Sequence, residues 1–210
     1  MKYQNSYKID YSQRKPKPEV DELFYHRWSP RSFKKVEIKH NVLESIIDAA
    51  CWSQSAFNEQ PWRFLTSTPE SFDKFLNLLM ERNQMWAKNA SVLGFIISKK
   101  QFSHNEKPNK WANFVTGAAW MGLTLQARRF GLYTHGMAGI KRDEVYESFS
   151  IDKEKYRVIC AFALGVIDEP EKLHESFQRW KNHQLENHWM RSGKWVSRKI
   201  KRTKFLYKSN

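Results

Sequence analysis

The sequence predicts a single compact domain of the α+β class. Its 210 residues fit one domain of ordinary size, and 40% hydrophobic with 28% charged residues is typical of a globular chain. Two segments dominated by apolar residues, 92–98 and 156–166, are typical of buried strands. Strand and helix patterns alternate along the chain, but not in the regular order of a βαβ ladder, so we expect an α+β fold.

The first third of the chain predicts an extended arm, two helices and a strand. We expect residues 1–18 to form the arm, because two prolines stop a helix there and apolar residues are sparse. Apolar residues at helical spacing then predict helices over residues 20–26 and 39–50. A polar loop, residues 53–62, leads from the second helix into a strand over residues 62–66.

The next segment predicts a helix followed by a central strand. Thr68 is a good N-cap residue, and Pro69 fits the first helical position. The predicted buried face of this helix consists of Phe72, Phe75, Leu76 and Leu79. The apolar run over residues 92–98 then predicts a strand buried on both faces.

The longest predicted helix covers residues 109–130 and ends at Gly131. Its predicted buried face consists of Trp111, Val115, Ala118, Gly122 and Leu125. The middle of the helix is small, at Ala118, Ala119 and Gly122. Small residues favour close approach of another helix, although ordinary core packing would give the same pattern.

The last elements are a strand over residues 133–137, a helix over residues 142–149 and a buried strand over residues 156–166. Residues 168–210 are predicted as an irregular arm rich in Trp, Lys and Arg. The predicted organisation is therefore an N-terminal arm (1–18), one domain (19–167) and a C-terminal extension with a basic tail (168–210).

The net charge of +14 lies mainly at the two ends of the chain. Residues 187–210 carry +8 and residues 1–18 carry +4, which leaves +2 for residues 19–186. A nucleic-acid-binding fold would place a basic stripe on its body. We therefore expect no nucleic-acid partner, and a basic binder of nucleic acid or membrane surfaces is a weaker alternative that depends on the tail alone.

The two cysteines and the apolar runs exclude several classes of protein. Cys51 and Cys160 are far apart and lack partners at metal-binding spacing, which excludes a disulfide-stapled secreted scaffold and a cysteine zinc site. We expect Cys51 to be buried within its helix. The longest apolar run, residues 159–167, is shorter than the roughly 20 residues of a membrane-spanning helix. The N-terminus lacks the apolar core of a secretory signal, so the default expectation is the cytoplasm.

Three segments carry residue types that could bind a ligand. Residues 27–32, RWSPRS, place two guanidinium groups and two hydroxyls on a proline-stiffened loop, which suits a phosphate monoester. Residues 55–63 place amides beside aromatic rings, which suits the edge of a heterocycle. Residues 135–140 hold two glycines three apart, which lets backbone N–H groups approach a ligand. Taken singly, each also fits a plain structural element: a solvated basic loop, an Asx-type turn and a tight strand-to-helix turn.

Several familiar sites are absent from the sequence. It contains neither the glycine fingerprint of a Rossmann dinucleotide domain nor a P-loop. It contains no GxSxG elbow, and no Ser/His/Asp arrangement is evident. His183, Glu186 and His188 are close in sequence but off one-face helical spacing, so we expect no metal site.

In their order along the chain, the three segments resemble the FMN-dependent nitroreductase family. The shared patterns are Arg-x-Ser-x-Arg-x-Phe at residues 27–33 and Ser-x-x-Asn-x-Gln-Pro-Trp-x-Phe at residues 55–64. Further matches are Ala49-Ala50, Asn83 ahead of Ala90, Gly131-Leu132, Gly139 and Ala163-Leu164-Gly165. The resemblance runs from about Leu23 to Val166, and the Asn-x-Gln-Pro-Trp loop is its most specific part.

The resemblance implies a fold and an assembly. The family fold is α+β, with a central mixed β-sheet flanked by helices, built as an intertwined homodimer with two FMN sites at the interface. Ser55, Ala56 and Asn58 match the loop that, in the family, packs on the flavin of the other subunit.

The resemblance also implies FMN-binding residues. Arg27, Ser29 and Arg31 match the residues that hold the phosphate and ribityl chain, with Trp28 lying against them through its backbone.

Around the flavin ring, three further positions match the family. Asn83 matches a residue that hydrogen-bonds the ring, and Ala138 and Gly139 match the pair whose backbone N–H faces flavin N5.

One departure from the family concerns the C-terminal segment. The position of a usual phosphate-binding arginine falls on Asn182, which leaves open whether Arg179 or Lys181 takes its role. Val166-Ile167 also replaces the usual Gly-Tyr-Pro ending of the last strand.

The implied function is ping-pong electron transfer, in which NAD(P)H reduces FMN and an oxidised acceptor then takes the electrons. The acceptor could be a nitroaromatic, a quinone or a flavin, and no protein acid or base is assigned, because the cofactor supplies the chemistry. The alternative is a catalytically idle flavin-binding or scaffold protein of the same fold. The spectrum of the purified protein, and its bleaching by NAD(P)H without oxygen, would discriminate these readings.

Overall fold

The computed structural model describes residues 2–12, 14 and 19–177. The helices are α1 (Glu22–His26), α2 (His40–Cys51), α3 (Phe72–Asn77), α4 (Glu81–Ala87), α5 (Ala112–Arg129) and α6 (Arg142–Ser148). Two 3-10 turns are η1 (Ala56–Asn58) and η2 (Pro170–Lys172). The strands are β1 (Phe33–Lys34), β2 (Trp62–Thr66), β3 (Val92–Lys99), β4 (Tyr133–Met137) and β5 (Tyr156–Ile167).

The sheet is organised around β5, which pairs with β1, β3 and β4, while β2 pairs with the other edge of β3. The strands predicted from the apolar runs are confirmed to within one residue at each end. The expected mixed sheet is not found, because every pairing among the described strands is antiparallel. Two neighbouring strands can run parallel only if a crossover connection brings the chain back to the end of the sheet where the first strand began. No neighbouring strands of the described chain are connected in this way.

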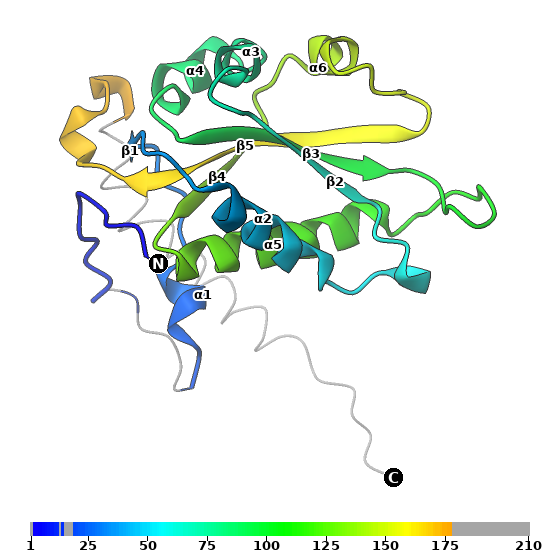
Figure 1. The fold of residues 1–210 in the computed structure, drawn as a ribbon, viewed down its shortest axis with the longest axis horizontal. Coiled ribbons are helices and arrows are strands. Elements are labelled where there is room, and N and C mark those ends of the chain that lie inside the picture. Colours follow the sequence, from blue (N-terminus) through cyan, green and yellow to red (C-terminus); the bar gives the residue numbers. More distant parts are fainter. Residues whose placement is uncertain (1, 13, 15–18, 178–210) are drawn as a thin grey trace, which may run out of the picture.

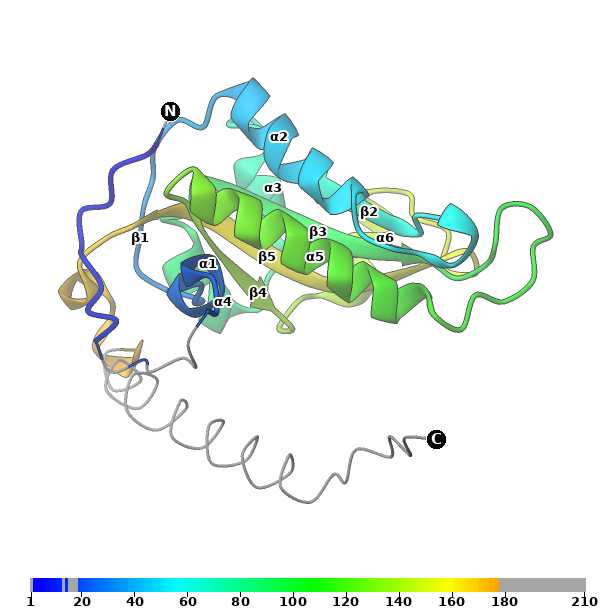
Figure 2. The ribbon, with the colours of Figure 1, turned by 90° about the horizontal axis from the view of Figure 1, so that it is seen from below.

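Helices cover both faces of the sheet, so the domain has three layers (Figures 1 and 2). One face, under α3, α4 and α6, is packed around Trp86, Phe95 and Val145. The other face, under α2 and α5, is packed around Ile46 and Leu123. Side chains of β3 alternate between the two cores, and this explains the unbroken apolar run in its sequence.

The buried face of α5 is rotated from the predicted one. Val115 is buried as predicted, but Trp111 is 63% exposed. The buried residues of the helix are Ala112, Val115, Thr116, Ala119, Leu123, Thr124 and Ala127. A pattern of apolar residues does not predict the burial of Thr116 and Thr124. They are buried because their hydroxyls are hydrogen-bonded, that of Thr116 to Ser98 and that of Thr124 to Thr134.

The close helix approach predicted from the small residues of α5 is confirmed. A Cβ atom at Gly122 would lie 2.9 Å from the backbone oxygen of Ala49 in α2. Figure 2 shows α2 and α5 side by side on one face of the sheet. The small residues are thus used for packing within one chain.

The helix predicted from Thr68 begins later, at Phe72. Thr68 and Ser71 exchange hydrogen bonds between their backbone N–H groups and hydroxyls, and this closes a turn before the helix. Phe72, Phe75 and Leu79 are buried as predicted. The helix α4, which follows directly, was not predicted.

The N-terminal arm lies against the ends of α5 and β5. The Tyr3 N–H donates to the Phe130 oxygen, and the Ser6 N–H donates to the Ile167 oxygen. Gly131 ends α5 as predicted, with φ of +80°, and a Cβ atom there would lie 2.4 Å from the Tyr3 oxygen. Only glycine therefore allows both the left-handed turn and the contact with the arm.

The prediction that Cys51 is buried is wrong, because this residue is exposed at the end of α2. Ala50, the residue before it, is fully buried, whereas Trp52, the residue after it, is 84% exposed. Within the described residues, no helix is long and apolar enough to cross a membrane. The C-terminal segment around Asn182 and the basic tail lie outside the described residues.

Candidate functional site

A cavity of about 450 Å³ lies between α4 and the segment at the end of β4. Its lining residues are Arg31, Met80, Arg82, Asn83, His135, Gly136, Met137, Ala138, Gly139 and Phe177. None of them is acidic, and two carry guanidinium groups. The volume lies in the range of small-molecule sites, roughly 300–1,000 Å³, so the cavity is the candidate binding site.

His135 connects the loop of residues 27–32 to β4. Its Nδ1 atom lies 2.8 Å from the Pro30 carbonyl oxygen. A carbonyl oxygen can only accept, so Nδ1 carries the proton and donates it. Burial, followed by the charge of Arg31, lowers the pKa of His135 to about 4. The imidazole is therefore neutral at pH 7, and it holds the loop that carries Arg31 beside the cavity.

Asn83 connects α4 to the turn after β4. Its Nδ2 atom donates to the Gly139 oxygen over 2.9 Å, and the Met80 N–H donates to the same oxygen. A Cβ atom at Gly139 would lie 2.7 Å from Asn83 Nδ2, so a larger residue would push the two segments apart. Glycine here keeps the backbone after Ala138 close to α4 and exposed to the cavity.

Arg31 and Arg82 place two positive charges at the cavity. Burial, followed by the charge of Arg82, lowers the pKa of Arg31. The guanidinium carbon of Arg82 lies 5.8 Å from the centre of the Phe177 ring. Since none of the described lining residues carries a carboxylate, this field favours an anionic ligand.

Arg27 lies beside the cavity loop but does not line the cavity. Its Nη1 atom is 3.5 Å from the Ser29 hydroxyl. Burial lowers the pKa of Arg27, while nearby Tyr11 opposes that effect. Trp28, the next residue, has a buried indole N–H that finds no acceptor among the described residues. A buried donor without an acceptor is costly, but Trp28 packs against the core under α3, α4 and α6 and does not line the cavity.

The structure thus divides the predicted site residues into three groups. Arg31, Asn83, Ala138 and Gly139 line one cavity. Arg27, Trp28 and Ser29 precede Arg31 on the same loop. Ser55, Ala56 and Asn58 lie in and before η1, at the opposite end of the sheet from α4 (Figures 1 and 2). They cannot reach the cavity of their own chain.

The η1 loop is held in a strained backbone conformation. Phe57, Asn58 and Gln60 have φ values of +56°, +52° and +47°, which non-glycine residues rarely adopt. The Ser55 hydroxyl accepts from the Gln60 N–H, and the Gln60 side chain donates to Asn58. Strain of this kind persists only where surrounding contacts impose it, and it is concentrated at functional sites.

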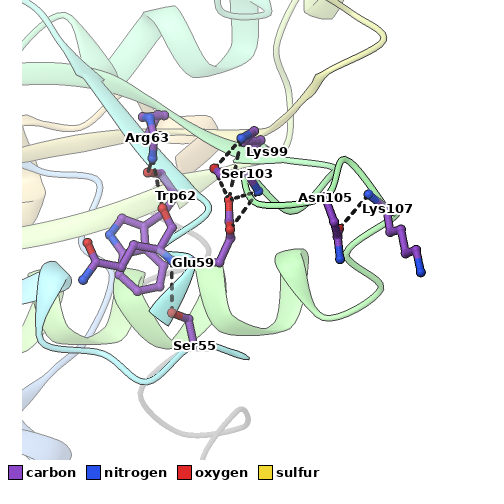
Figure 3. Close-up of polar contacts among 9 residues, drawn as sticks. Ser55, Glu59, Trp62, Arg63, Lys99, Ser103, Asn105 and Lys107 are labelled. Carbon is purple, nitrogen blue, oxygen red and sulfur yellow. Dashed lines mark hydrogen bonds and ion pairs between the residues drawn. The ribbon is translucent and has the colours of Figure 1, made fainter. Parts of the chain in front are cut away.

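Glu59 supplies the contact that holds this loop. Figure 3 shows its carboxylate facing Ser103 and Lys99, which lie beyond and at the end of β3. The carboxylate accepts from the Ser103 hydroxyl over 2.6 Å and from the Ser103 N–H over 2.9 Å. The Lys99 ammonium lies 3.6 Å away, and the Glu59 side chain is 5% exposed.

Sequence reasoning missed several lining residues. His135, Gly136 and Met137 belong to the segment that was singled out for its glycines, but they were not assigned to the site. Met80 and Arg82 were missed because α4 was not predicted. Phe177 begins the C-terminal segment considered for phosphate binding, and its own side chain is buried beside the cavity. The sequence signal that could have identified Arg82 as a lining residue is its position next to Asn83, which was assigned to the site.

Comparison with known proteins identifies the class of protein. The family model of the nitroreductase family matches residues 25–85 and 69–166. These matches cover most of the described fold and include the cavity loop, the η1 loop and the turn after β4. The protein is therefore an oxidoreductase enzyme. The chain belongs to the nitroreductase family.

Individual relatives agree with this assignment. A solved structure described as "the oxidoreductase containing FMN" is 40% identical, with a TM-score of 0.75, and the match covers 80% of this chain and 86% of that one. A nitroreductase family protein from Clostridium novyi NT has the same fold at 20% identity, with a TM-score of 0.61 over 73% of this chain and 87% of that one. The Bacillus subtilis (strain 168) protein named "Putative NAD(P)H nitroreductase YdgI" is 26% identical over 69% of this chain and 86% of its own length.

Proposed function

We propose that the cavity binds FMN and that the protein passes electrons from NAD(P)H to an oxidised acceptor such as a nitroaromatic or a quinone. The observation that carries this proposal is that one cavity is lined by Arg31, Asn83, Ala138 and Gly139, which come from three separate segments of the chain. The relative that is 40% identical contains FMN, and the Bacillus subtilis relative is named for NAD(P)H and nitro compounds.

The residues present fit an FMN molecule. Arg31 offers a fork of N–H donors suited to a phosphate or to an electron-rich ring edge. The Asn83 side chain and the backbone after Ala138 offer hydrogen-bonding groups on the wall formed by α4 and the turn after β4.

In the proposed mechanism the protein binds and orients. When bound, FMN supplies the redox chemistry between the donor and the acceptor. Arg27, Ser29 and Arg31 hold the phosphate and ribityl chain, and neutral His135 keeps their loop against β4. Asn83 and the Ala138–Gly139 backbone would hold the ring, and the hydrogen bond from Asn83 to the Gly139 oxygen keeps these two groups together.

We also propose that the functional unit is a homodimer in which Ser55, Ala56 and Asn58 complete the site of the partner subunit. These residues lie far from their own cavity, on a loop whose shape is imposed by Glu59. Large apolar side chains are exposed at the same end of the α2 and α5 layer: Trp52 (84%), Phe57 (80%), Trp111 (63%) and Phe114 (71%). Such a patch on a monomer is typical of an interface.

The test compares FMN with riboflavin, which lacks the phosphate. Arg27→Ala and Arg31→Ala should each weaken FMN binding by about tenfold to a hundredfold, since a charge-assisted hydrogen bond contributes roughly 1.5–3 kcal/mol. Riboflavin should be nearly insensitive to both changes. Arg157→Ala, which removes an exposed arginine that does not line the cavity, is the control. Equal losses for both ligands would refute the phosphate assignment.

Two further measurements address the enzyme and the dimer. Bleaching of the bound flavin spectrum by NAD(P)H without oxygen should occur, and its absence would favour the idle flavin-binding protein. Light scattering at micromolar concentration should give twice the 25.1 kDa chain mass. A monomer that binds FMN stoichiometrically would contradict the shared site.

A further inference from the structure

Arg82 stands apart from the residues that the resemblance assigns to FMN. It comes from α4, next to Asn83, and it lines the cavity together with Arg31. Its side chain is exposed, whereas Arg31 is half-buried. The two guanidinium groups therefore occupy different depths of one cavity, with Arg82 at the rim.

The position of Arg82 at the rim is defined by Phe177. The guanidinium carbon lies 5.8 Å from the centre of the Phe177 ring, within the range of a cation–π contact. Phe177 itself is buried and lines the cavity. The ring thus orients a charged group that would otherwise sample many rotamers at the surface.

The charge of Arg82 is not neutralised by a carboxylate of the described chain. Within the described residues it forms no ion pair, and the cavity lining contains no acidic side chain. Arg31 lines the same cavity with a charge of the same sign, and the charge of Arg82 adds to burial in lowering the pKa of Arg31. Two like charges facing one cavity repel each other, and an anion between or above them would relieve that repulsion.

We propose that Arg82 recognises the substrate, and that the preferred electron acceptor carries a carboxylate or phosphate beside its reducible group. This inference rests on the proposed function, in which the deeper arginines hold the cofactor. A ligand that exchanges in each turnover meets the rim first, and an exposed guanidinium there can bind and release an anion without closing the site. A resident cofactor is held by the half-buried loop instead.

The experiment uses 4-nitrobenzoate as the anionic probe and 4-nitrobenzamide as its neutral counterpart of similar shape. Their dissociation constants from the oxidised, FMN-loaded protein are measured by perturbation of the flavin absorbance. Arg82→Gln should weaken 4-nitrobenzoate binding about tenfold, because one charge-assisted contact at a partly hydrated rim is lost. Binding of 4-nitrobenzamide should change less than about twofold, a difference within ordinary surface effects.

Two controls separate charge from fold. Arg157→Gln removes an exposed charge from β5, outside the cavity lining, and should leave both probes unchanged. Arg82→Lys should restore part of the preference for the anion, because it returns the charge without the planar fork. The preference of the unmodified protein should also shrink at high salt, where exposed charges are screened.

Several outcomes would overturn the proposal. Equal weakening of both probes by Arg82→Gln would assign Arg82 to packing. A loss confined to NADPH relative to NADH in the reductive half-reaction would assign it to the electron donor. Loss of FMN from Arg82→Gln would assign it to the cofactor.

If the protein fails to bind FMN, the proposed function is refuted, but the role of Arg82 can still be tested. Equilibrium dialysis of 4-nitrobenzoate against the FMN-free chain and its Arg82→Gln variant then measures the anion site directly. Equal binding by the two would refute the role of Arg82.

Discussion

Removing the carboxylate of Glu59 should release the η1 loop. In the structure this side chain joins the loop to Ser103 and Lys99, beyond and at the end of β3 (Figure 3). The Phe57 ring adds edge contacts with the rings of Phe102 and His104. Phe57, Asn58 and Gln60, all with positive φ, depend on such a contact to remain in their conformation. We therefore expect Glu59→Ala to cost stability and to disturb the position of Asn58.

The magnitude follows from the contacts that are lost. Two donors of Ser103 bond the carboxylate at 2.6 and 2.9 Å, and hydrogen bonds to a charged group contribute roughly 1.5–3 kcal/mol each. Water replaces part of this at the surface, so Glu59→Ala should lower the free energy of unfolding by about 2–4 kcal/mol. For a domain of this size that corresponds to a decrease in Tm of roughly 5–15 °C. Glu59→Gln keeps an acceptor and should cost about half as much.

The assay is thermal and denaturant unfolding of Glu59→Ala, Ser103→Ala and the double variant. Because the two side chains bond each other, their effects should fail to add by at least about 1 kcal/mol. Glu37→Ala, which removes an exposed carboxylate outside this loop, should be nearly neutral. Additive effects, or an equal loss in Glu37→Ala, would refute this account of the loop.

The same contact predicts a pH dependence. Burial opposes ionisation of Glu59, but the hydrogen bonds from Ser103 and the charge of Lys99 outweigh it and lower its pKa below the usual 4.5. A carboxyl with a lowered folded pKa stabilises the fold above its unfolded pKa and loses that contribution as the pH falls through the folded value. The stability difference between wild type and Glu59→Gln should therefore shrink below about pH 4.5.

Three further predictions concern other parts of the fold. Gly122→Ala should lower the free energy of unfolding by about 1–3 kcal/mol in denaturant titrations, because its Cβ would lie 2.9 Å from the Ala49 oxygen; an unchanged midpoint would contradict the helix contact. His135, with its pKa lowered to about 4 by burial and Arg31, favours the fold fully above pH 6.5 and loses up to about 3 kcal/mol as the pH falls toward 4. His135→Gln should be less acid-sensitive over that interval, and an unchanged acid profile would argue against a buried neutral imidazole. Thiol reagents should label exposed Cys51 first and Cys160 slowly, since burial raises the pKa of Cys160 to about 11; faster labelling of Cys160 would contradict its position in β5.

Local patterns in the sequence were sufficient for most of the secondary structure. The apolar runs of β3 and β5 and the helical spacing of α2 identified these elements almost to the residue, because each buries a continuous face or both faces. Gly131 was identified as a helix end for a reason that the structure bears out, namely its left-handed backbone. The prediction of helix bounds failed where side-chain hydrogen bonds compete with helix formation. The hydroxyls of Thr68 and Ser71 close a turn, so α3 begins later than predicted.

Tertiary contacts determined the features that the spacing of apolar residues in the sequence cannot predict. Which face of α5 is buried depends on the hydroxyl partners of Thr116 and Thr124, which come from β3 and β4. The exposure of Cys51 depends on where α2 leaves the sheet, because helical spacing alone does not tell the last turn from the middle. The antiparallel character of the described sheet depends on how β5 meets three strands at once.

The candidate site shows the same division. The sequence by itself supplied the candidate groups: Arg31 and the glycine turn after β4 from their residue types, and Asn83 from the family resemblance. Only the tertiary structure decided that they share one cavity with Arg82, His135 and Phe177. It also separated them from the η1 loop, which lies at the other end of the sheet. The physical reason is that a motif specifies local donors and backbone shape, whereas a cavity is enclosed by segments whose distance in space is fixed only when the two cores pack.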